Sequence, residues 1–325
     1  MYDVVIVGGG PAGLSAALYC ARRSLSTVII SKDVGGQAAS TSVIENYPGV
    51  GAVDGAELMQ RFKQQAVDQG AEFVLGEVKG ITKLSDGNFE TTYNNETMVS
   101  RSIVLAFGLT PRNLNVPGEE QLSGKGVYHS TAGVRDLMKN KNVAVVGGGN
   151  SALETSIELG SVAKKVFLIH RRDTFRAEEV LVKSMQESSN VEQVLNAQVA
   201  EIIGSDKVQK ITITQKGESD VTRELEVDAV FINAGFMSAV KFVSNIVELN
   251  KKNEIIVDET CHTSSVGVFA AGDVTTSKYK QVIVSAGEGC KAALECYTYL
   301  MELDGKEVKI DQDWKVSNDN HFIRT

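Results

Sequence analysis

The sequence lacks the features that mark several other classes of protein. No apolar run approaches the roughly 18 residues that a membrane span needs, so we expect no membrane association. The 325 residues carry a net charge of -8, which argues against nucleic acid as a partner. Only 4 prolines accompany 30 glycines, and this balance predicts close backbone approaches within ordered structure. The first residues have no basic segment ahead of an apolar one, so no signal peptide is expected.

Cysteine is also sparse, and its spacing excludes a common redox device. The four cysteines are Cys20, Cys261, Cys290 and Cys296, and no two of them form a Cys-x-x-Cys pair. Cys290 and Cys296 are too far out of phase to share one face of a helix. We therefore interpret all four as small buried residues of a reduced, cytoplasmic protein, and we predict no metal site.

Two segments of the chain repeat one pattern. Residues 2–18 and 142–159 each place a glycine cluster between a short apolar run and an amphipathic stretch, and a second apolar run follows each, at Thr27–Ile30 and Lys165–Ile169. Each unit reads as strand, helix and strand. The sequence thus predicts an α/β fold of two Rossmann-like, three-layer domains. Residues 113–242 form a domain inserted into one that is split between 1–112 and 243–325.

The first glycine cluster fits the dinucleotide-binding pattern G-x-G-x-x-G. A first glycine permits the tight turn, a second lets the backbone approach a pyrophosphate, and a third lets helix and strand pack closely. A ligand-free glycine turn is the alternative. The acidic residue that commonly binds a ribose is not evident, because Ser31 or Lys32 stands at its place and Asp33 follows. The predicted binding residues are Gly8, Gly10, Pro11, Ala12 and Gly13.

The second glycine cluster is followed by basic residues where the first unit has none. Its second strand ends at His170, Arg171 and Arg172, and Arg176 lies close behind. Guanidinium groups bind a 2′-phosphate in bidentate fashion, so this strand end predicts NADPH in preference to NADH. A basic surface loop is the alternative. The predicted contacts in the glycine cluster are Gly147, Gly149, Asn150, Ser151 and Ala152.

A further strand ends in Gly272 and Asp273, which suit the ribityl and pyrophosphate chain of a flavin, or form a simple turn. Taken together, the motifs VVIVGGGPAGLSAA, GGQ, ENYPG, LAFG, VAVVGGGNSALE, HRRDTFRAEE and FAAGDV resemble the low-molecular-weight thioredoxin reductase family over residues 1 to about 303. The resemblance implies FAD in the split domain, NADPH in the inserted domain, and a homodimer. It also implies flavin contacts by Gly36, Gln37, Asn46, Ala106, Gly108, Gln281, Val282 and Ala286.

The chain departs from that family in two places. The family has a Cys-x-x-Cys just before the NADPH-binding strand, and Ser130–Gly133 stand there instead. The chain also continues for about twenty residues after the last helix, as in the ferredoxin/flavodoxin–NADP reductases of thioredoxin reductase type. By that second resemblance, Tyr47, Trp314, His321 and Phe322 are candidates to cover the flavin, although a solvated tail is equally compatible. His129 is a candidate proton donor beside the vacated cysteine position, or a polar residue of the connection.

These observations predict an enzyme that transfers a hydride from NADPH to FAD, which then reduces ferredoxin or flavodoxin directly. A thioredoxin-like protein as acceptor, reaction with oxygen, and a non-catalytic flavin sensor are the alternatives.

The tail generates a first testable prediction. Deleting residues 314–325 removes Trp314, His321 and Phe322, so the flavin should become more exposed and its reaction with oxygen faster. The flavin absorption spectrum and the rate of oxygen consumption with NADPH measure this. An unchanged spectrum together with unchanged acceptor kinetics would show that the tail does not cover the flavin.

Overall fold

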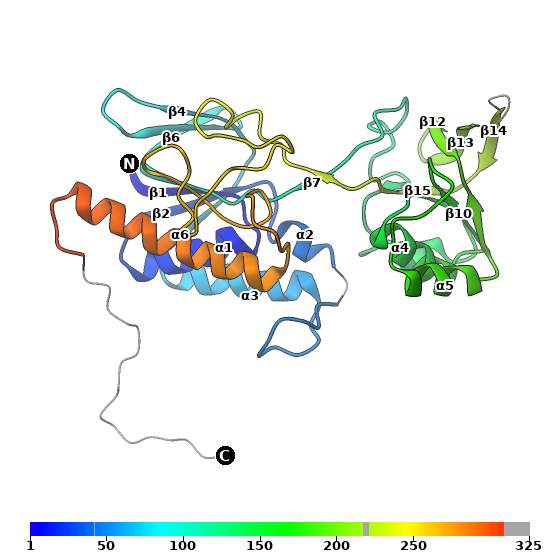
Figure 1. Ribbon diagram of the computed structural model, residues 1–325, viewed down its shortest axis with the longest axis horizontal. Coiled ribbons are helices and arrows are strands. Elements are labelled where there is room, and N and C mark those ends of the chain that lie inside the picture. Colours follow the sequence, from blue (N-terminus) through cyan, green and yellow to red (C-terminus); the bar gives the residue numbers. More distant parts are fainter. Residues whose placement is uncertain (42, 217–220, 309–325) are drawn as a thin grey trace, which may run out of the picture.

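The computed structural model describes residues 1–41, 43–216 and 221–308 (Figure 1). Trp314, His321 and Phe322 lie outside the described residues, so their predicted roles stay predictions. Among the described residues, no helix is both long and apolar enough to cross a membrane.

The larger of the two main sheets has seven strands in the order β3-β2-β1-β6-β5-β4, with β17 also paired to β6. β1, β2, β3 and β17 run parallel to their neighbours, and β4 and β5 form an antiparallel extension. The strands are β1 (Tyr2–Val7), β2 (Thr27–Ser31), β3 (Glu72–Leu75), β4 (Val78–Lys83), β5 (Phe89–Tyr93), β6 (Glu96–Leu105) and β17 (Val268–Ala270).

Helices cover one face of this sheet. α1 (Pro11–Arg22), α3 (Gly55–Asp68) and α6 (Val282–Leu303) pack there, while irregular chain from residues 240–275 covers the other face (Figure 1). Alternate residues of β1 enter the two cores, since Val4 and Ile6 face the helices and Val5 and Val7 face the opposite layer. This alternation follows from the two-residue period of a strand. A short helix, α2 (Gly36–Ala39), follows β2.

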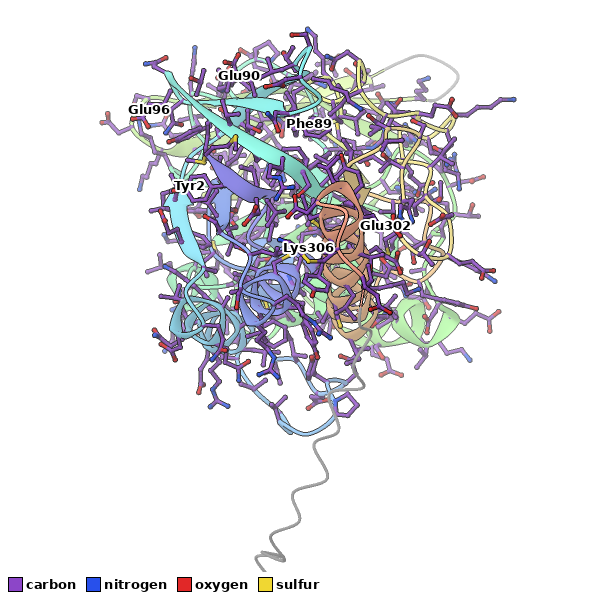
Figure 2. All side chains as sticks on the ribbon, turned by 90° about the vertical axis from the view of Figure 1, so that its left-hand side faces the viewer. Tyr2, Phe89, Glu90, Glu96, Glu302 and Lys306 are labelled. Atoms are coloured by element: carbon purple, nitrogen blue, oxygen red, sulfur yellow. The ribbon has the colours of Figure 1, made fainter. Side chains whose placement is uncertain are left out.

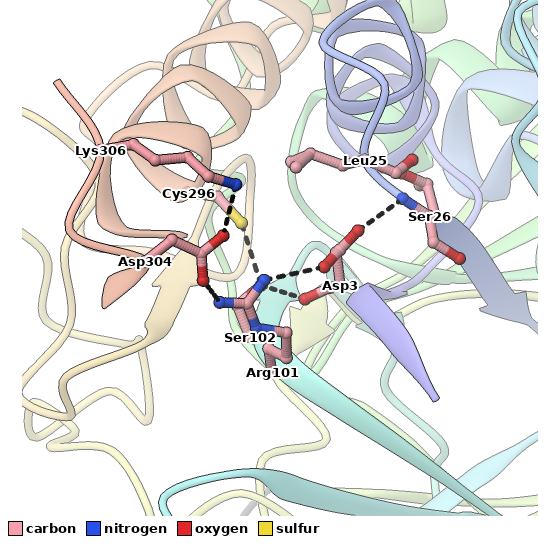
Figure 3. A network of polar contacts seen from close by, with 9 residues as sticks. Asp3, Leu25, Ser26, Arg101, Ser102, Cys296, Asp304 and Lys306 are labelled. Atoms are coloured by element: carbon pink, nitrogen blue, oxygen red, sulfur yellow. Dashed lines mark hydrogen bonds and ion pairs between the residues drawn. The ribbon is translucent and has the colours of Figure 1, made fainter. Parts of the chain in front are cut away.

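A polar network anchors the far end of α6 to the sheet. Arg101 of β6 donates to Asp3 of β1 at 3.1 Å and also pairs with Asp304, which follows α6 (Figure 3). Lys306 pairs with the same Asp304 at 3.0 Å. In the view of Figure 2, Tyr2 marks the sheet and Lys306 the end of the helix. The network thus joins residues from both ends of the described chain.

The second main sheet is wholly parallel, in the order β11-β10-β9-β15-β8. Helices α4 (Asn150–Gly160) and α5 (Glu179–Glu187) cover one face, and an antiparallel three-stranded sheet covers the other. The strands are β8 (Val127–Tyr128), β9 (Asn142–Gly147), β10 (Lys165–Ile169), β11 (Val191–Val194), β12 (Ala197–Gly204), β13 (Val208–Gln215), β14 (Val221–Glu226) and β15 (Ala229–Asn233). A 3-10 helix (Arg135–Met138) precedes β9.

A two-stranded ribbon connects the two bodies. β7 (Thr110–Pro111) pairs antiparallel with β16 (Phe236–Met237), and Arg112 Nε donates to the Phe236 carbonyl at 2.9 Å. Figure 1 shows the ribbon running between the two bodies. The outgoing and returning chains therefore lie side by side.

The α/β fold class predicted from the glycine motifs is confirmed, because β1–α1–β2 and β9–α4–β10 are the two expected units. The strand expected near residues 266–273 is shorter, since its ladder with β6 holds only Val268–Ala270. The sequence patterns did not identify α3, α5 or β14. The domain boundaries at residues 112 and 243 stay predictions.

The contact between α1 and α6 generates a second prediction. A Cβ on Gly289 of α6 would lie 2.0 Å from the Ala12 carbonyl oxygen, whereas one on Gly287 meets no atom within 4 Å. Gly289→Ala should therefore lower the free energy of unfolding by at least about 2 kcal/mol, because backbone atoms must move apart. Gly287→Ala, the matched control, should raise it by up to about 1 kcal/mol through helix propensity. Urea denaturation measures both, and equal effects would contradict the close contact.

Candidate functional site

The first glycine loop is shaped by backbone contacts. Gly8 has a positive φ of 111°, and a Cβ on Gly13 would lie 1.9 Å from the Gly8 carbonyl oxygen. A Cβ on Gly10 would instead meet only the Gly35 carbonyl oxygen, at 3.8 Å. Gly10 is the N-cap of α1 and has no side-chain cap, so the first N–H groups of the helix face open space. Such a helix start suits a pyrophosphate.

The other residues predicted to bind FAD gather at the same edge of the sheet. Val7, Leu105 and Ala270 end three parallel strands in one register, so the turns that follow them lie together. Pro11 and Ala12 open α1, Ala106 and Gly108 follow β6, Gly272 and Asp273 follow β17, Gly36 and Gln37 lie in α2, and Gln281, Val282 and Ala286 lie at the start of α6. This edge is the usual ligand-binding edge of a parallel sheet.

Two long-range hydrogen bonds join segments of this edge. Asn46 Nδ2 donates to Gln281 Oε1 at 3.1 Å, across 235 residues of sequence. Gln37 Nε2 donates to the Leu109 carbonyl at 3.0 Å. The structure therefore brings Asn46 and Gln281 together, as their shared assignment to the flavin requires, and their contacts with FAD stay predictions.

Asp273 and Glu288 shape the turn after β17. The Gly272 N–H donates to Glu288 Oε2 at 2.8 Å, and Ser285 Oγ donates to Asp273 Oδ1 at 3.2 Å. Burial raises the pKa of Asp273, and the Ser285 bond opposes that rise. Asp273 is half-buried, and a carboxylate with remaining acceptor capacity fits the hydroxyl groups of a ribityl chain.

The residues at the end of β2, where an acidic side chain commonly binds a ribose, form hydrogen bonds and an ion pair within the protein. Ser31 Oγ, at the end of β2, accepts the Gly9 N–H at 2.8 Å. Lys32 pairs with Glu77 at 2.5 Å, and Asp33 Oδ1 accepts the Gly36 N–H at 2.9 Å. All three side chains therefore hold the loop or its surroundings.

A cavity of about 430 Å³ lies at the second glycine loop. Its wall is built from the carboxyl ends of β9, β10 and β15 and from the start of α4. The lining includes most of the predicted nucleotide contacts, namely Gly147, Gly149, Asn150, Ser151, Ala152, His170, Arg171 and Arg176. Arg172 was predicted with them but is not among the lining residues; it is exposed, and its carbonyl accepts the Asn196 N–H at 3.2 Å.

The His170 ring packs against Gly148 of the second glycine loop. A Cβ on Gly148 would lie 2.2 Å from the His170 ring, and His170 Nε2 donates to the Thr174 carbonyl at 3.1 Å. Burial lowers the pKa of His170, the Thr174 bond opposes this, and Arg172, Arg176 and Arg171 lower it further. The imidazole is thus neutral near neutral pH, and the arginines supply the positive charge.

Two observations show that this cavity fits a dinucleotide. A Cβ on Gly149 meets no atom within 4 Å, so the start of α4 lies open beside the cavity. Asn233, at the end of β15, lines the cavity, and its Oδ1 atom is buried without a hydrogen-bond partner among the described residues. A ribose hydroxyl or carboxamide would satisfy that oxygen. Neither Asn233 nor Phe236, which also lines the cavity, was identified from the sequence.

The segment that replaces the cysteine pair is held by hydroxyl groups. Ser130 Oγ donates to the Ser40 carbonyl at 2.8 Å, and Thr131 Oγ1 donates to Glu158 Oε2 at 2.8 Å. His129 lies just before them on the wall of the dinucleotide cavity, where Nδ1 donates to the Ile232 carbonyl at 3.2 Å. This bond orients the imidazole ring on the cavity wall. A role of His129 at the flavin stays a prediction.

The thiols are buried or half-buried. Cys20, Cys261 and Cys296 are buried, and Cys290 is half-buried. Hydrogen bonding with Cys296 and burial raise the pKa of Cys20, and burial raises the pKa of Cys261 to about 12. Cys296 itself bonds with Ser102 Oγ at 3.0 Å (Figure 3). Raised pKa values keep Cys20 and Cys261 as unreactive thiols at neutral pH.

Tyr47 packs against α3. Its ring meets Phe62 edge-on at a centroid distance of 5.6 Å, and burial raises its pKa. The ring is half-buried. Its predicted place over the flavin stays a prediction.

Comparison with known proteins places this geometry in a family. Residues 2–289 match the family described as pyridine nucleotide-disulphide oxidoreductase. The chain is 36% identical over 301 residues to an alkyl hydroperoxide reductase (its F subunit) of Staphylococcus aureus (strain NCTC 8325 / PS 47), and equally to an NADH dehydrogenase of Bacillus subtilis (strain 168). Each alignment covers 92% of this chain and 59% of the relative, so the chain spans about three-fifths of their length.

Solved structures show the same likeness along nearly the whole chain. Lactococcus lactis thioredoxin reductase in its FR conformation superposes with a TM-score of 0.81 at 32% identity, covering 93% of this chain and 100% of the other. A ferredoxin-flavin thioredoxin reductase from Clostridium acetobutylicum gives 0.51 at 28% identity, covering 93% and 98%. The resemblance to thioredoxin reductases is confirmed, and FAD and NADPH are the cofactors that such proteins use.

The arginine loop generates a third prediction. Arg171→Ala and Arg176→Ala should each weaken binding of NADP⁺ by about tenfold or more and leave NAD⁺ almost unchanged, because a charge-assisted bond acts only on the 2′-phosphate. Arg172→Ala, whose side chain is off the cavity wall, should have the smaller effect. Calorimetry with each nucleotide measures this, and equal losses for both nucleotides would contradict the assignment.

Proposed function

The chain belongs to the pyridine nucleotide-disulphide oxidoreductase family, and from that premise we propose that it oxidises NADPH and passes the electrons through FAD directly to an external acceptor. FAD, when bound, accepts the hydride and releases the electrons. The chain's own residues bind and orient the two cofactors. The first glycine loop and Asp273 hold FAD, and the second glycine loop with Arg171 and Arg176 holds NADPH.

One observation carries this proposal. The loop between β8 and the 3-10 helix, where a dithiol would receive electrons from the flavin, contains Ser130 and Gly133 at the two cysteine positions. A serine hydroxyl and a glycine cannot form a disulfide. Ser130 is instead engaged with the Ser40 carbonyl. The buried thiols elsewhere do not substitute, because Cys20 and Cys261 are protonated at neutral pH.

A one-electron carrier such as ferredoxin or flavodoxin is the acceptor that we propose first. Without an internal dithiol, a disulfide substrate such as thioredoxin would have to react with the flavin itself, which is the chemically harder route. A ferredoxin-flavin thioredoxin reductase is among the similar structures, so a ferredoxin partner has a precedent on a related fold.

Oxygen or a quinone is a second candidate acceptor. The similarity to an NADH dehydrogenase favours it, because the name of that relative specifies no disulfide substrate. We further propose a homodimer, by analogy with thioredoxin reductases, and a cytoplasmic location, where free thiols persist.

An anaerobic titration tests the absence of an internal relay. Complete bleaching of the flavin should consume a single equivalent of NADPH per FAD, because no sulfur pair takes up further electrons. Absorbance near the flavin maximum measures the endpoint. Consumption of a second equivalent, with new free thiols after denaturation, would overturn the proposal.

The acceptor is identified by mixing the reduced protein with ferredoxin, flavodoxin, thioredoxin or oxygen in a stopped-flow instrument. Fast reoxidation by ferredoxin or flavodoxin is the expected result. Reoxidation by oxygen alone would favour the oxidase, and reoxidation by thioredoxin would contradict the proposed route. Failure of NADPH to bleach the flavin would refute hydride transfer itself and leave a sensor.

A further inference from the structure

The dinucleotide cavity is built from two loops that one ligand must span. The glycine loop at Gly147–Ala152 faces the expected pyrophosphate, and the arginine loop at His170–Arg176 faces the expected 2′-phosphate. A rigid ligand can engage both only when their separation is fixed, and small displacements of a binding group are costly. A residue that sets this separation therefore influences nucleotide selectivity even where, like Glu178, it is not on the cavity wall.

Backbone contacts supply part of the coupling. The Arg176 N–H donates to the Gly148 carbonyl at 2.8 Å, and the His170 ring packs directly on Gly148. These contacts locate the base of the arginine loop. They leave the segment after Arg176, where the chain enters α5, to be held by another interaction.

Two reciprocal hydrogen bonds between Asn150 and Glu178 hold the segment that enters α5. Asn150 Nδ2 donates to Glu178 Oε1 at 2.9 Å, and the Glu178 N–H donates to Asn150 Oδ1 at 3.0 Å. Asn150 is the first residue of α4, and Glu178 is the N-cap of α5. Both polar ends of the asparagine amide are thereby used on one partner. The pair closes the arginine loop between two helix starts.

The negative charge of Glu178 does not itself favour binding of a 2′-phosphate. A carboxylate two residues from Arg176 lowers the local positive potential that a 2′-phosphate needs. Its side chain also provides no cap to α5 by hydrogen bonding. The two bonds to Asn150 explain its presence better than its charge does.

We propose that Glu178 and Asn150 form a positioning pair that sets the selectivity for a 2′-phosphorylated nucleotide. The proposal rests on the proposed function, because it takes Arg171 and Arg176 as the 2′-phosphate site. Glu178 does not touch the nucleotide. It fixes the chain just after Arg176, and together with the Arg176 N–H bond to Gly148 it sets the position of Arg176 at which both phosphates of one molecule are engaged.

Calorimetric titration of the FAD-loaded protein with 2′,5′-ADP and 5′-AMP, which differ only in the 2′-phosphate, tests this without turnover. The ratio of the two affinities isolates the 2′-phosphate. Glu178→Ala should lower this ratio by about tenfold, which is the loss of well-positioned charge-assisted bonding, and should change 5′-AMP binding by less than about twofold. Glu178→Gln keeps an acceptor for Asn150 and should restore the ratio of the unmodified protein.

Two further variants separate positioning from charge and from stability. Glu179→Ala removes the neighbouring exposed carboxylate of the first turn of α5 and should leave the ratio unchanged or slightly higher. Asn150→Ala should lower the ratio as Glu178→Ala does, and the double variant should be no worse than either, as expected for a coupled pair.

The outcomes distinguish the two proposals. If the unmodified protein binds 2′,5′-ADP no better than 5′-AMP, the assignment of the 2′-phosphate site is wrong and the positioning pair is refuted with it. If the unmodified protein shows the preference but Glu178→Ala keeps it, the site stands and the positioning pair is refuted. If Glu178→Gln behaves like Glu178→Ala, charge and not hydrogen bonding is responsible, which also refutes the pair.

Discussion

The structure depends on close contacts between main-chain atoms at the places where nucleotides are expected to bind. Gly13 lies against the Gly8 carbonyl, and Gly289 of α6 lies against Ala12 of α1, at distances that leave no room for a Cβ. Because these contacts are made by main-chain atoms, they cannot relax by a change of rotamer. They fix the start of α1 beside the ends of β1, β6 and β17, and the residues assigned to FAD gather there as a result.

The second body has the same glycine loop and uncapped helix start, but different polar side chains surround them. In both bodies the helix after the glycine loop begins without a side-chain cap, which leaves N–H groups for a phosphate. The first body then uses Ser31 to hold its own loop, whereas the second presents Arg171 and Arg176 to the cavity. The same backbone device thus serves two cofactors, and the side chains at the end of the second strand distinguish them.

The absence of the cysteine pair leaves the fold undisturbed, and under the proposed function it changes the route of the electrons. Ser130 and Thr131 make hydrogen bonds to Ser40 and Glu158, so the loop is held by hydroxyl groups and not by a sulfur bond. Cys20 lies in α1 and Cys296 in α6, and hydrogen bonding between them together with burial raises the pKa of Cys20. Under the proposed function, a flavin bound here finds no Cys-x-x-Cys pair to reduce in this chain, so an external molecule takes the electrons.

The sequence by itself determined the two strand–helix–strand units, because glycine spacing and hydrophobic periodicity are local properties of the chain. It also determined the absence of a dithiol and the position of the arginine cluster, which follow from residue identity alone. Tertiary structure decided that Asn46 meets Gln281, that Glu178 meets Asn150, and that Arg172 lies off the cavity wall while Arg176 lies on it. It also placed the unpaired oxygen of Asn233 in the cavity. These facts depend on which strands are neighbours and on how loops turn after them, and no local pattern records either.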